Sequence, residues 1–336
     1  MYAFLLGAGC NLLCRSLKCA TVKDYIKDVA SFLILFSKDH RDYRFDSANA
    51  LRMSSTLHNV FEELKTWDDM AKRREPFTLD MLTAQQQWTE AGEFGPDTEE
   101  AALLDWFEVG LFTGMRLAEW AQPSHKSDPA CPNLNKRLQT AAFCLNDVRA
   151  EMKGGQRISG AVILDHPVAS IKKMWVKWRM QKNGENGEEK MFSLPESKLA
   201  RSFIRPMYRI LQRFVRLRGI DDLTTPLSVY QHAKAEKGVR LLHSANIEKS
   251  MRRTAAKVYN LDKSNEVDAA MLQRWSSHSI RVGACCILHA MGFDAIQIKF
   301  ILRWKSDTFM LYLRNNGILA DQQHRAFDKL GAMPNF

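Results

Sequence analysis

The sequence predicts a mainly α-helical protein with a small antiparallel β-sheet, divided into two domains. Apolar residues recur at three- and four-residue spacing along most of the 336-residue chain, as in helices with one buried face. Strand-like segments surround QKNGENGEEK, whose two Asn-Gly steps favour a hairpin. The basic run AKRREPF contains a proline and interrupts the helical pattern, so we place the domain boundary there, with domains at 1–74 and 77–336.

The first domain is predicted to consist of helices. Two segments show helical spacing: 21–36, with Thr21 as a candidate cap, and 54–70. Their apolar positions are Val22, Tyr25, Ile26, Val29, Phe32 and Leu33 in the first segment and Leu57, Val60, Phe61, Leu64 and Trp67 in the second. Apolar sequence begins almost at Met1, which leaves open that this domain lacks an N-terminal piece.

The second domain is predicted to combine helices with the sheet. A break at Gly110 or Gly114 would divide one of its helical segments in two. The alternation of Met174, Val176 and Trp178 with their neighbours indicates a strand with one buried face. The predicted elements are helices at 78–91 and 98–121, a surface loop at 121–137, strands at 141–152, 171–180 and 191–194, and helices from Pro206 almost to the end.

Composition limits the possible classes of function. The chain is 46% hydrophobic and 26% charged, which fits a globular protein with a sizeable core. Its formal charge of +10 suits a polyanionic partner such as nucleic acid, although many basic proteins bind none. The seven cysteines lack the spacing of disulfide frameworks or zinc sites, so we interpret them as buried thiols in a reducing compartment. With no basic leader and no membrane-spanning stretch, the sequence predicts a soluble intracellular protein without membrane contact.

Three candidate residues lie in the first half of the second domain, and each has an ordinary structural explanation. Arg116 and Glu119, in TGMRLAEW, are three residues apart and would share a helix face, as surface ion pairs do. Lys182 lies in or beside the predicted hairpin turn, where a lysine is normally solvated.

Four more candidates lie in the stretch 274–316. His278 and Arg281 stand three residues apart near the start of a predicted helix, a spacing that is common by chance. Trp304 and Tyr312 follow at positions that would ordinarily belong to a core. Taken singly, none of these residues indicates a function.

In this order, however, the residues resemble the catalytic set of the tyrosine recombinases, the phage-integrase family. TGMRLAEW is similar to the family's first arginine box, HSIRVGA to its second, and FILRWKSDTFMLYLRN to the box that ends with the nucleophile. RWKSD followed by YLRN is most similar to eukaryotic mobile-element recombinases of the Crypton and DIRS types. Trp304 and Tyr312 are eight residues apart, not nine as in many bacterial and phage members, and the mobile-element branch shares this shorter spacing.

The resemblance implies a helical core-binding domain followed by an α+β catalytic domain. It implies that Arg116 and Arg281 clamp the non-bridging oxygens of a phosphodiester and that Trp304 donates one more N–H. Tyr312 would attack the phosphorus and form a covalent bond, so that neither ATP nor a metal is needed.

The resemblance also implies how protons move. His278 would assist removal of the proton from Tyr312, and Lys182 would protonate the leaving 5′ oxygen. Glu119 would orient Arg116 or His278 from behind.

Basic helical segments supply candidate DNA contacts. RSFIRPMYRILQRFVRLRG spaces arginines at helical steps, and SANIEKSMRRTAAKVYNL lies where the family has a helix that enters the major groove. A solvated face is the ordinary alternative for both. The predicted DNA-binding residues are Lys249, Arg252, Arg253, Arg205 and Arg209, together with Lys72, Arg73 and Arg74 at the linker.

The sequence therefore predicts a site-specific DNA recombinase encoded by a mobile element. It would act as a homotetramer on two double-stranded DNA sites, in the nucleus of a eukaryote or otherwise at the nucleoid, with no cofactor, metal or small-molecule substrate. Segment 317–336 would either complete the local core or dock on a neighbouring protomer. The alternatives are a catalytically inactive DNA-binding relic, a type IB topoisomerase-like enzyme and an all-helical interaction protein.

Overall fold

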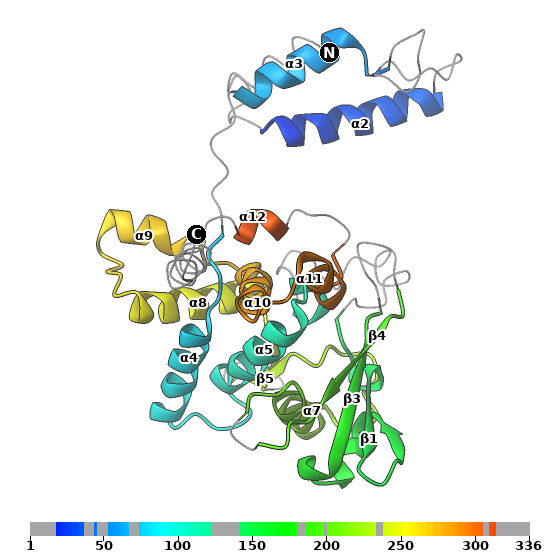
Figure 1. The fold of residues 1–336 in the computed structure, drawn as a ribbon, viewed down its shortest axis with the longest axis vertical. Coiled ribbons are helices and arrows are strands. Elements are labelled where there is room, and N and C mark those ends of the chain that lie inside the picture. The colour runs from blue at the N-terminus through cyan, green and yellow to red at the C-terminus, as the bar shows by residue number, and fades with distance from the viewer. Residues whose placement is uncertain are drawn as a thin grey trace, which may run out of the picture. The chain divides into compact units, whose positions relative to one another are not determined.

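A computed structural model describes residues 18–36, 44–45, 53–66, 74–121, 142–179, 186–197, 200–232, 238–304 and 309–313. The fold is mainly helical with a small antiparallel sheet, as predicted (Figure 1). The chain divides into two compact units, Met1–Lys72 and Arg73–Phe336. This division falls within the basic segment AKRREPF. None of the helices within the described ranges is long and apolar enough to cross a membrane.

The first unit is built on two helices, α2 (Cys19–Phe36) and α3 (Ser55–Thr66). Val22 and Ile26 of α2 pack with the apolar face of α3, in a cluster completed by Cys19, Leu57, Phe61 and Leu64. The prediction for α2 is wrong in two respects. The helix begins before Thr21, and Tyr25, Val29 and Phe32 are exposed, because α3 covers only one stripe of α2. Trp67 lies outside the described residues.

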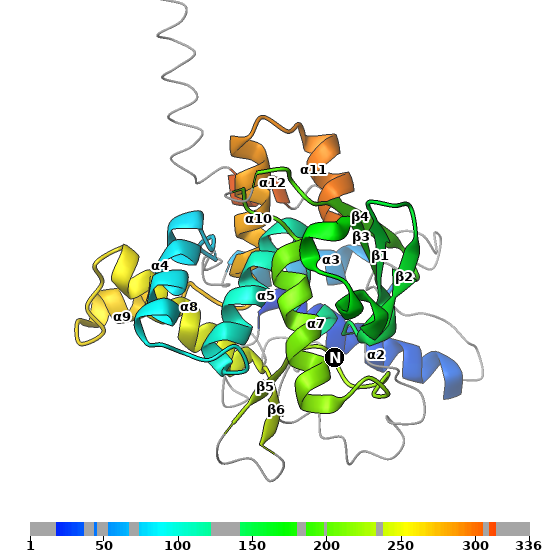
Figure 2. The ribbon, with the colours of Figure 1, turned by 90° about the horizontal axis from the view of Figure 1, so that it is seen from below.

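The second unit is organised around helix α5 (Glu99–Thr113), whose residues are mostly buried. It packs against α4 (Leu79–Ala91), α7 (Ile204–Arg218) and α10 (Ser279–Ala290). Two views show α5 and α7 lying between the sheet on one side and α4 and α8 (Ser244–Val258) on the other (Figures 1 and 2). The remaining helices are α9 (Glu266–Leu272), α11 (Ala295–Leu302) and the short α12 (Met310–Leu313).

The main sheet is antiparallel with strand order β2-β1-β3-β4. Its strands are β1 (Val148–Met152), β2 (Arg157–Ser159), β3 (Ile171–Lys177) and β4 (Glu189–Ser193). The predicted hairpin is confirmed, since β3 pairs with β4 in a register that places Trp175 opposite Met191. Met174, Val176 and Trp178 are buried, as their alternation predicts.

The sequence did not indicate three of the short strands. β2 was not expected, and neither were β5 (Val229–Gln231) and β6 (Val239–Leu241), which pair with each other. The expectation of helix from Pro206 onward is therefore wrong at β5 and β6. Strands of three residues are too short to show an alternating pattern.

Two glycines lie where segments near the candidate site approach each other closely. Gly114 ends α5 in the left-handed region at φ 56°, and a Cβ there would lie 2.6 Å from Leu302 Cδ2. A Cβ on Gly283 in α10 would lie 2.0 Å from the carbonyl oxygen of Phe77. The first contact brings the end of α5 against α11, and the second brings α10 against the segment before α4.

Candidate active site

Three segments that are distant in sequence meet at the guanidinium of Arg281. Arg281 lies in the first turn of α10 and is 5% exposed. It donates to the carbonyl oxygen of Gly114, in the loop after α5, and to that of Leu302, at the end of α11, at 3.3 Å. Its guanidinium carbon also lies 4.7 Å from the centroid of the Trp304 ring. The structure thus brings Arg281 and Trp304 together beside the Arg116 loop.

Arg116 is held by the carboxylate of Glu119. Arg116 caps the 3₁₀ turn η1 (Leu117–Glu119) in an extended conformation. Its main-chain N–H donates to Glu119 Oε2 at 2.9 Å, and its guanidinium Nη1 donates to Oε1 at 3.1 Å. The Arg116 side chain is 29% exposed, whereas that of Glu119 is 3% exposed. The expected ion pair is present, and its acidic member is buried.

Two residues that the sequence did not single out complete the surroundings of Glu119. Arg303, which is 1% exposed, donates from Nη2 to Glu119 Oε2 at 3.1 Å. Trp178, at the end of β3, donates from Nε1 to the same oxygen at 3.2 Å. The Arg303 guanidinium lies 3.8 Å from the Trp178 ring centroid. The only signal in the sequence was that Arg303 directly precedes Trp304.

His278 lies directly before α10, and the residue as a whole is exposed, although neighbouring groups partly desolvate its imidazole. Desolvation, together with the positive charges of Arg281, Arg74 and Arg116, lowers the pKa of His278 to about 4. The downward shift of this pKa has a clear physical cause, because the three nearby cations disfavour a positive charge on the imidazole. At neutral pH the imidazole is therefore neutral and can accept a proton.

Lys182 lies outside the described residues, but another lysine of the hairpin reaches the site. Lys190, on β4, donates from Nζ to the carbonyl oxygen of Ile301 in α11. Burial, followed by the charge of Arg303, lowers the pKa of Lys190 to about 8, against the opposite effect of Glu188. Lys190 is the last residue of the segment QKNGENGEEK, and only the fold distinguishes it from the other lysines nearby.

The short helix that contains Tyr312 packs beside α10, the helix that carries Arg281. Tyr312 lies within this short helix, α12. Phe309 and Leu313, on either side of it in sequence, are buried in a small cluster with Ile298 and Leu302. Phe309 also contacts the Trp304 ring, with centroids 5.1 Å apart. The side chain of Tyr312 is outside the described part, so its proposed role remains a prediction.

The arginines predicted to bind DNA from α7 all have contacts within the protein. Arg209 pairs with Asp105 at 2.6 Å, and Arg205 donates to the carbonyl oxygens of Ala200 and Ser197. Arg213, in the same helix, is not on a solvated face: it is buried and pairs with Asp105 at 2.6 Å. α7 therefore packs its basic side chains against the α5 region.

The basic residues of α8 differ in their exposure. Lys249 is exposed. Arg252 pairs with Glu248 at 3.1 Å, and the Arg253 guanidinium lies over Trp88 at 4.4 Å. At the linker, Arg74 donates to the carbonyl oxygen of Gln273 at 2.8 Å, whereas Lys72 and Arg73 lie outside the described residues.

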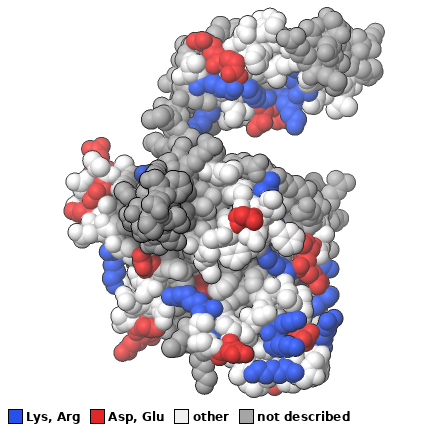
Figure 3. Space-filling model, in the orientation of Figure 1, with Lys and Arg blue, Asp and Glu red and all other residues white. Residues whose placement is uncertain are grey.

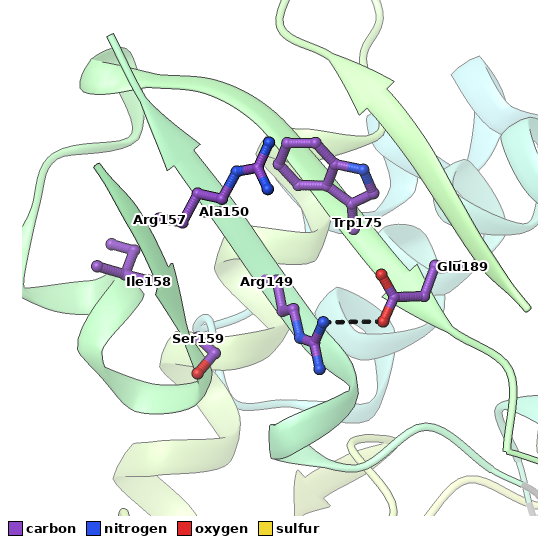
Figure 4. Close-up of a pocket in the computed structure, with 7 residues that line it drawn as sticks. All are labelled: Arg149, Ala150, Arg157, Ile158, Ser159, Trp175 and Glu189. Atoms are coloured by element: carbon purple, nitrogen blue, oxygen red, sulfur yellow. Dashed lines mark ion pairs between the residues drawn. The ribbon is translucent and has the colours of Figure 1, made fainter. Parts of the chain in front are cut away.

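The outer face of the sheet carries a hollow of about 430 Å³ that contains none of the predicted catalytic residues. Figure 4 shows the Arg157 guanidinium next to the Trp175 ring and the ion pair between Arg149 and Glu189, whose charged atoms are 3.0 Å apart. Figure 3 shows Lys and Arg interspersed with Asp and Glu over the sheet region. This mixed charge makes the hollow a poor match for a strongly anionic ligand.

The four described cysteines, Cys19, Cys144, Cys285 and Cys286, are buried and free, as the sequence predicted for its thiols. Cys10, Cys14 and Cys131 lie outside the described ranges. In comparisons with known proteins, no protein-family model matches the chain, and no curated protein matches it.

Proposed function

We propose that the chain is a site-specific DNA recombinase that cuts and rejoins DNA through a 3′-phosphotyrosyl intermediate. The single observation that carries this proposal is the buried Arg281, whose guanidinium joins the Arg116 loop to the end of α11 beside Trp304. A phosphodiester gathers negative charge on its non-bridging oxygens in the transition state. Two guanidiniums held on rigid elements suit that charge, because they do not lose their protons.

Tyr312 is the proposed nucleophile, and His278 is the proposed base. A phenol has a pKa of about 10, so it needs a proton acceptor at neutral pH. His278 is neutral at that pH and its imidazole can accept a proton, although its lowered pKa makes it a weaker base than an ordinary histidine. As the proton passes to His278, a bond forms between the phenolic oxygen and phosphorus, and the bond from phosphorus to the 5′ oxygen breaks.

The leaving 5′ oxygen takes its proton from a lysine. The resemblance assigns this role to Lys182. Lys190 is a second candidate, because its amine lies against α11 and has a pKa of about 8, close to the value that suits proton donation at neutral pH. Attack by a 5′ hydroxyl on the phosphotyrosyl bond reverses the step, so rejoining needs neither ATP nor metal.

The proposal extends to the setting of the reaction. The enzyme would be encoded by a mobile element and would act as a homotetramer on two DNA duplexes. It would work in the nucleus if its host is a eukaryote and otherwise at the nucleoid. Exposed Lys249 on α8 would contribute to DNA affinity through the phosphates, and such contacts make affinity depend on salt.

The test is to trap the covalent intermediate. The full chain is incubated with nicked duplexes covering the DNA that flanks its gene, without metal, and run on a denaturing gel. We expect a protein–DNA adduct that disappears in Tyr312→Phe and persists in Tyr259→Phe. Tyr259 is a matched control because its ring stacks on Trp275 outside the site, and phenylalanine preserves that contact.

Other outcomes identify the alternatives. Firm, salt-dependent DNA binding without an adduct would favour the inactive relic. An adduct accompanied by relaxation of supercoiled DNA, with no exchange between two duplexes, would favour the topoisomerase-like enzyme. A protein that neither binds DNA nor forms an adduct would contradict the proposed function.

A further inference from the structure

Arg303 combines two features that are each unfavourable for an arginine. It lies in the left-handed region at φ 57°, which side chains other than glycine and asparagine seldom adopt. Its side chain is also 1% exposed. Strained and buried positions of this kind are retained where the surrounding structure requires them, often near functional sites.

The Arg303 guanidinium joins three elements around one carboxylate. It binds Glu119 Oε2 at 3.1 Å and stacks on Trp178 at 3.8 Å, while the Trp178 indole N–H binds the same oxygen at 3.2 Å. The end of α11, the end of β3 and the turn η1 are therefore fixed to one another.

The contacts of Arg303 with Glu119 determine how strongly this carboxylate attracts the guanidinium of Arg116. Oε2 accepts from Arg303, from Trp178 and from the main chain of Arg116, whereas Oε1 accepts from the Arg116 guanidinium at 3.1 Å. Without Arg303, the buried carboxylate would have one guanidinium fewer to balance it. Arg116 would then be held more strongly by Glu119 and would attract a phosphate less.

Arg303 also acts on the amine of Lys190. Lys190 donates to Ile301, two residues before Arg303 in the chain. Among the described residues, the charged groups that act on Lys190 are Arg303, which disfavours its protonated form, and Glu188, which favours it. One buried cation thus influences both the arginine and the lysine of the site.

We propose that Arg303 is a positioning residue, which balances Glu119 so that Arg116 remains available to a phosphate and whose charge acts on the amine of Lys190. The role at Arg116 rests on the proposed function, whereas the coupling to Lys190 does not. The simpler explanation is that Arg303 only stabilises the fold, as a buried ion pair.

The variants are chosen to separate these explanations. Arg303→Gly removes the guanidinium and suits the left-handed backbone. If the glycine variant fails to fold, Arg303→Gln is used in its place. Arg303→Lys keeps the charge but loses the planar fork and the stacking on Trp178. Arg213→Lys is the matched control, because Arg213 is equally buried and pairs with Asp105 away from the candidate site.

The first measurement is an NMR titration of the full chain labelled with ¹³C at lysine Cε, with the Lys190 signal assigned from Lys190→Arg. We expect a midpoint near 8 in the wild type. The midpoint should rise in Arg303→Gly, because a nearby positive charge is lost. Arg303→Lys and Arg213→Lys should leave it close to the wild-type value. An unchanged midpoint in Arg303→Gly overturns the coupling.

The second measurement is single-turnover cleavage of a nicked duplex, with DNA affinity determined in parallel. Arg303→Gly should lower the cleavage rate on the order of 10- to 100-fold with little change in Kd, as loss of a supporting partner does elsewhere. Arg303→Lys should recover part of the rate, and Arg213→Lys should keep it wherever that variant is folded. A wild-type rate in Arg303→Gly overturns the positioning role. If the wild type itself cleaves nothing, the proposed function fails, and the titration still decides the coupling.

Discussion

The arginines of α7 and those of the candidate site look alike in sequence but are bound differently in the fold. In α7, Arg209 and Arg213 both pair with Asp105 at 2.6 Å, and Arg216 pairs with Asp97 at the same distance. In the site, Arg281 donates to the carbonyl oxygens of Gly114 and Leu302. A carboxylate cancels most of the charge of its partner, whereas a carbonyl dipole orients a guanidinium without neutralising it.

This difference separates the α7 arginines, which hold the fold, from Arg281, which keeps its charge for an anionic substrate. Arg116 lies between the two cases, because it shares the Glu119 carboxylate with Arg303. Asp105 is 2% exposed, so the α7 pairs replace solvent around a buried acid. Arg303 belongs to both groups, since it balances buried Glu119 and lies beside Trp304 in the chain. The number of arginines in a segment therefore says little about which of them meets DNA.

The largest effect is expected for Arg281→Gln. Loss of the guanidinium should lower the rate of covalent adduct formation on the order of 10³-fold, because it removes transition-state stabilisation at the phosphate. The measurement is single-turnover cleavage of the nicked duplex. Arg209→Gln, which alters a half-exposed arginine of α7, is the control and should cleave at nearly the wild-type rate. Equal losses in the two variants would erase the distinction between the two groups.

The reverse pattern is expected for Arg213→Met. Removing this cation leaves Asp105 buried with less compensation and should lower the free energy of unfolding by about 3–5 kcal/mol. Denaturant unfolding measures the change, and cleavage is compared at a temperature where both proteins are folded. A variant of wild-type stability would show that the α7 pairs do not hold the fold.

A smaller, pH-dependent effect is expected at His278. Its folded pKa of about 4 lies below the ordinary value near 6.5, so folding favours the neutral ring. This contribution to stability is complete above pH 6.5 and is lost as the pH falls from 6.5 towards 4. The melting temperature, measured between pH 4 and 7, should therefore depend less steeply on pH in His278→Gln than in the wild type. An unchanged dependence on pH in His278→Gln would contradict the lowered pKa.

The smallest effect is expected for single surface cations in DNA binding. Lys249→Gln should weaken affinity a few-fold and reduce the slope of log K against log salt by about one, because one phosphate contact is lost. Arg209→Gln should change both less, since that arginine is already paired with Asp105. Binding to a fixed duplex at several salt concentrations compares the two. A larger loss of affinity in Arg209→Gln than in Lys249→Gln would indicate that α7, and not α8, contacts the DNA.

The sequence alone determined the elements whose signals are local. Helical spacing identified α3 and α4, alternation identified the buried face of β3, and the two Asn-Gly steps identified the β3–β4 hairpin. These signals suffice because each depends on neighbours within one or two turns of chain. Local pattern did not identify the strands of three residues, nor the exposed side of α2.

Only the tertiary structure decided which charged residues meet. The order of motifs suggested Arg116, Arg281 and Trp304. The burial of Arg303 and the contact of Lys190 with α11 arise because the end of α11 meets Glu119, Trp178 and β4. The same is true of Arg213, whose helical spacing suggested a solvated stripe. The charge that a guanidinium presents to a ligand depends on partners tens of residues away, and a sequence pattern carries no distance between them.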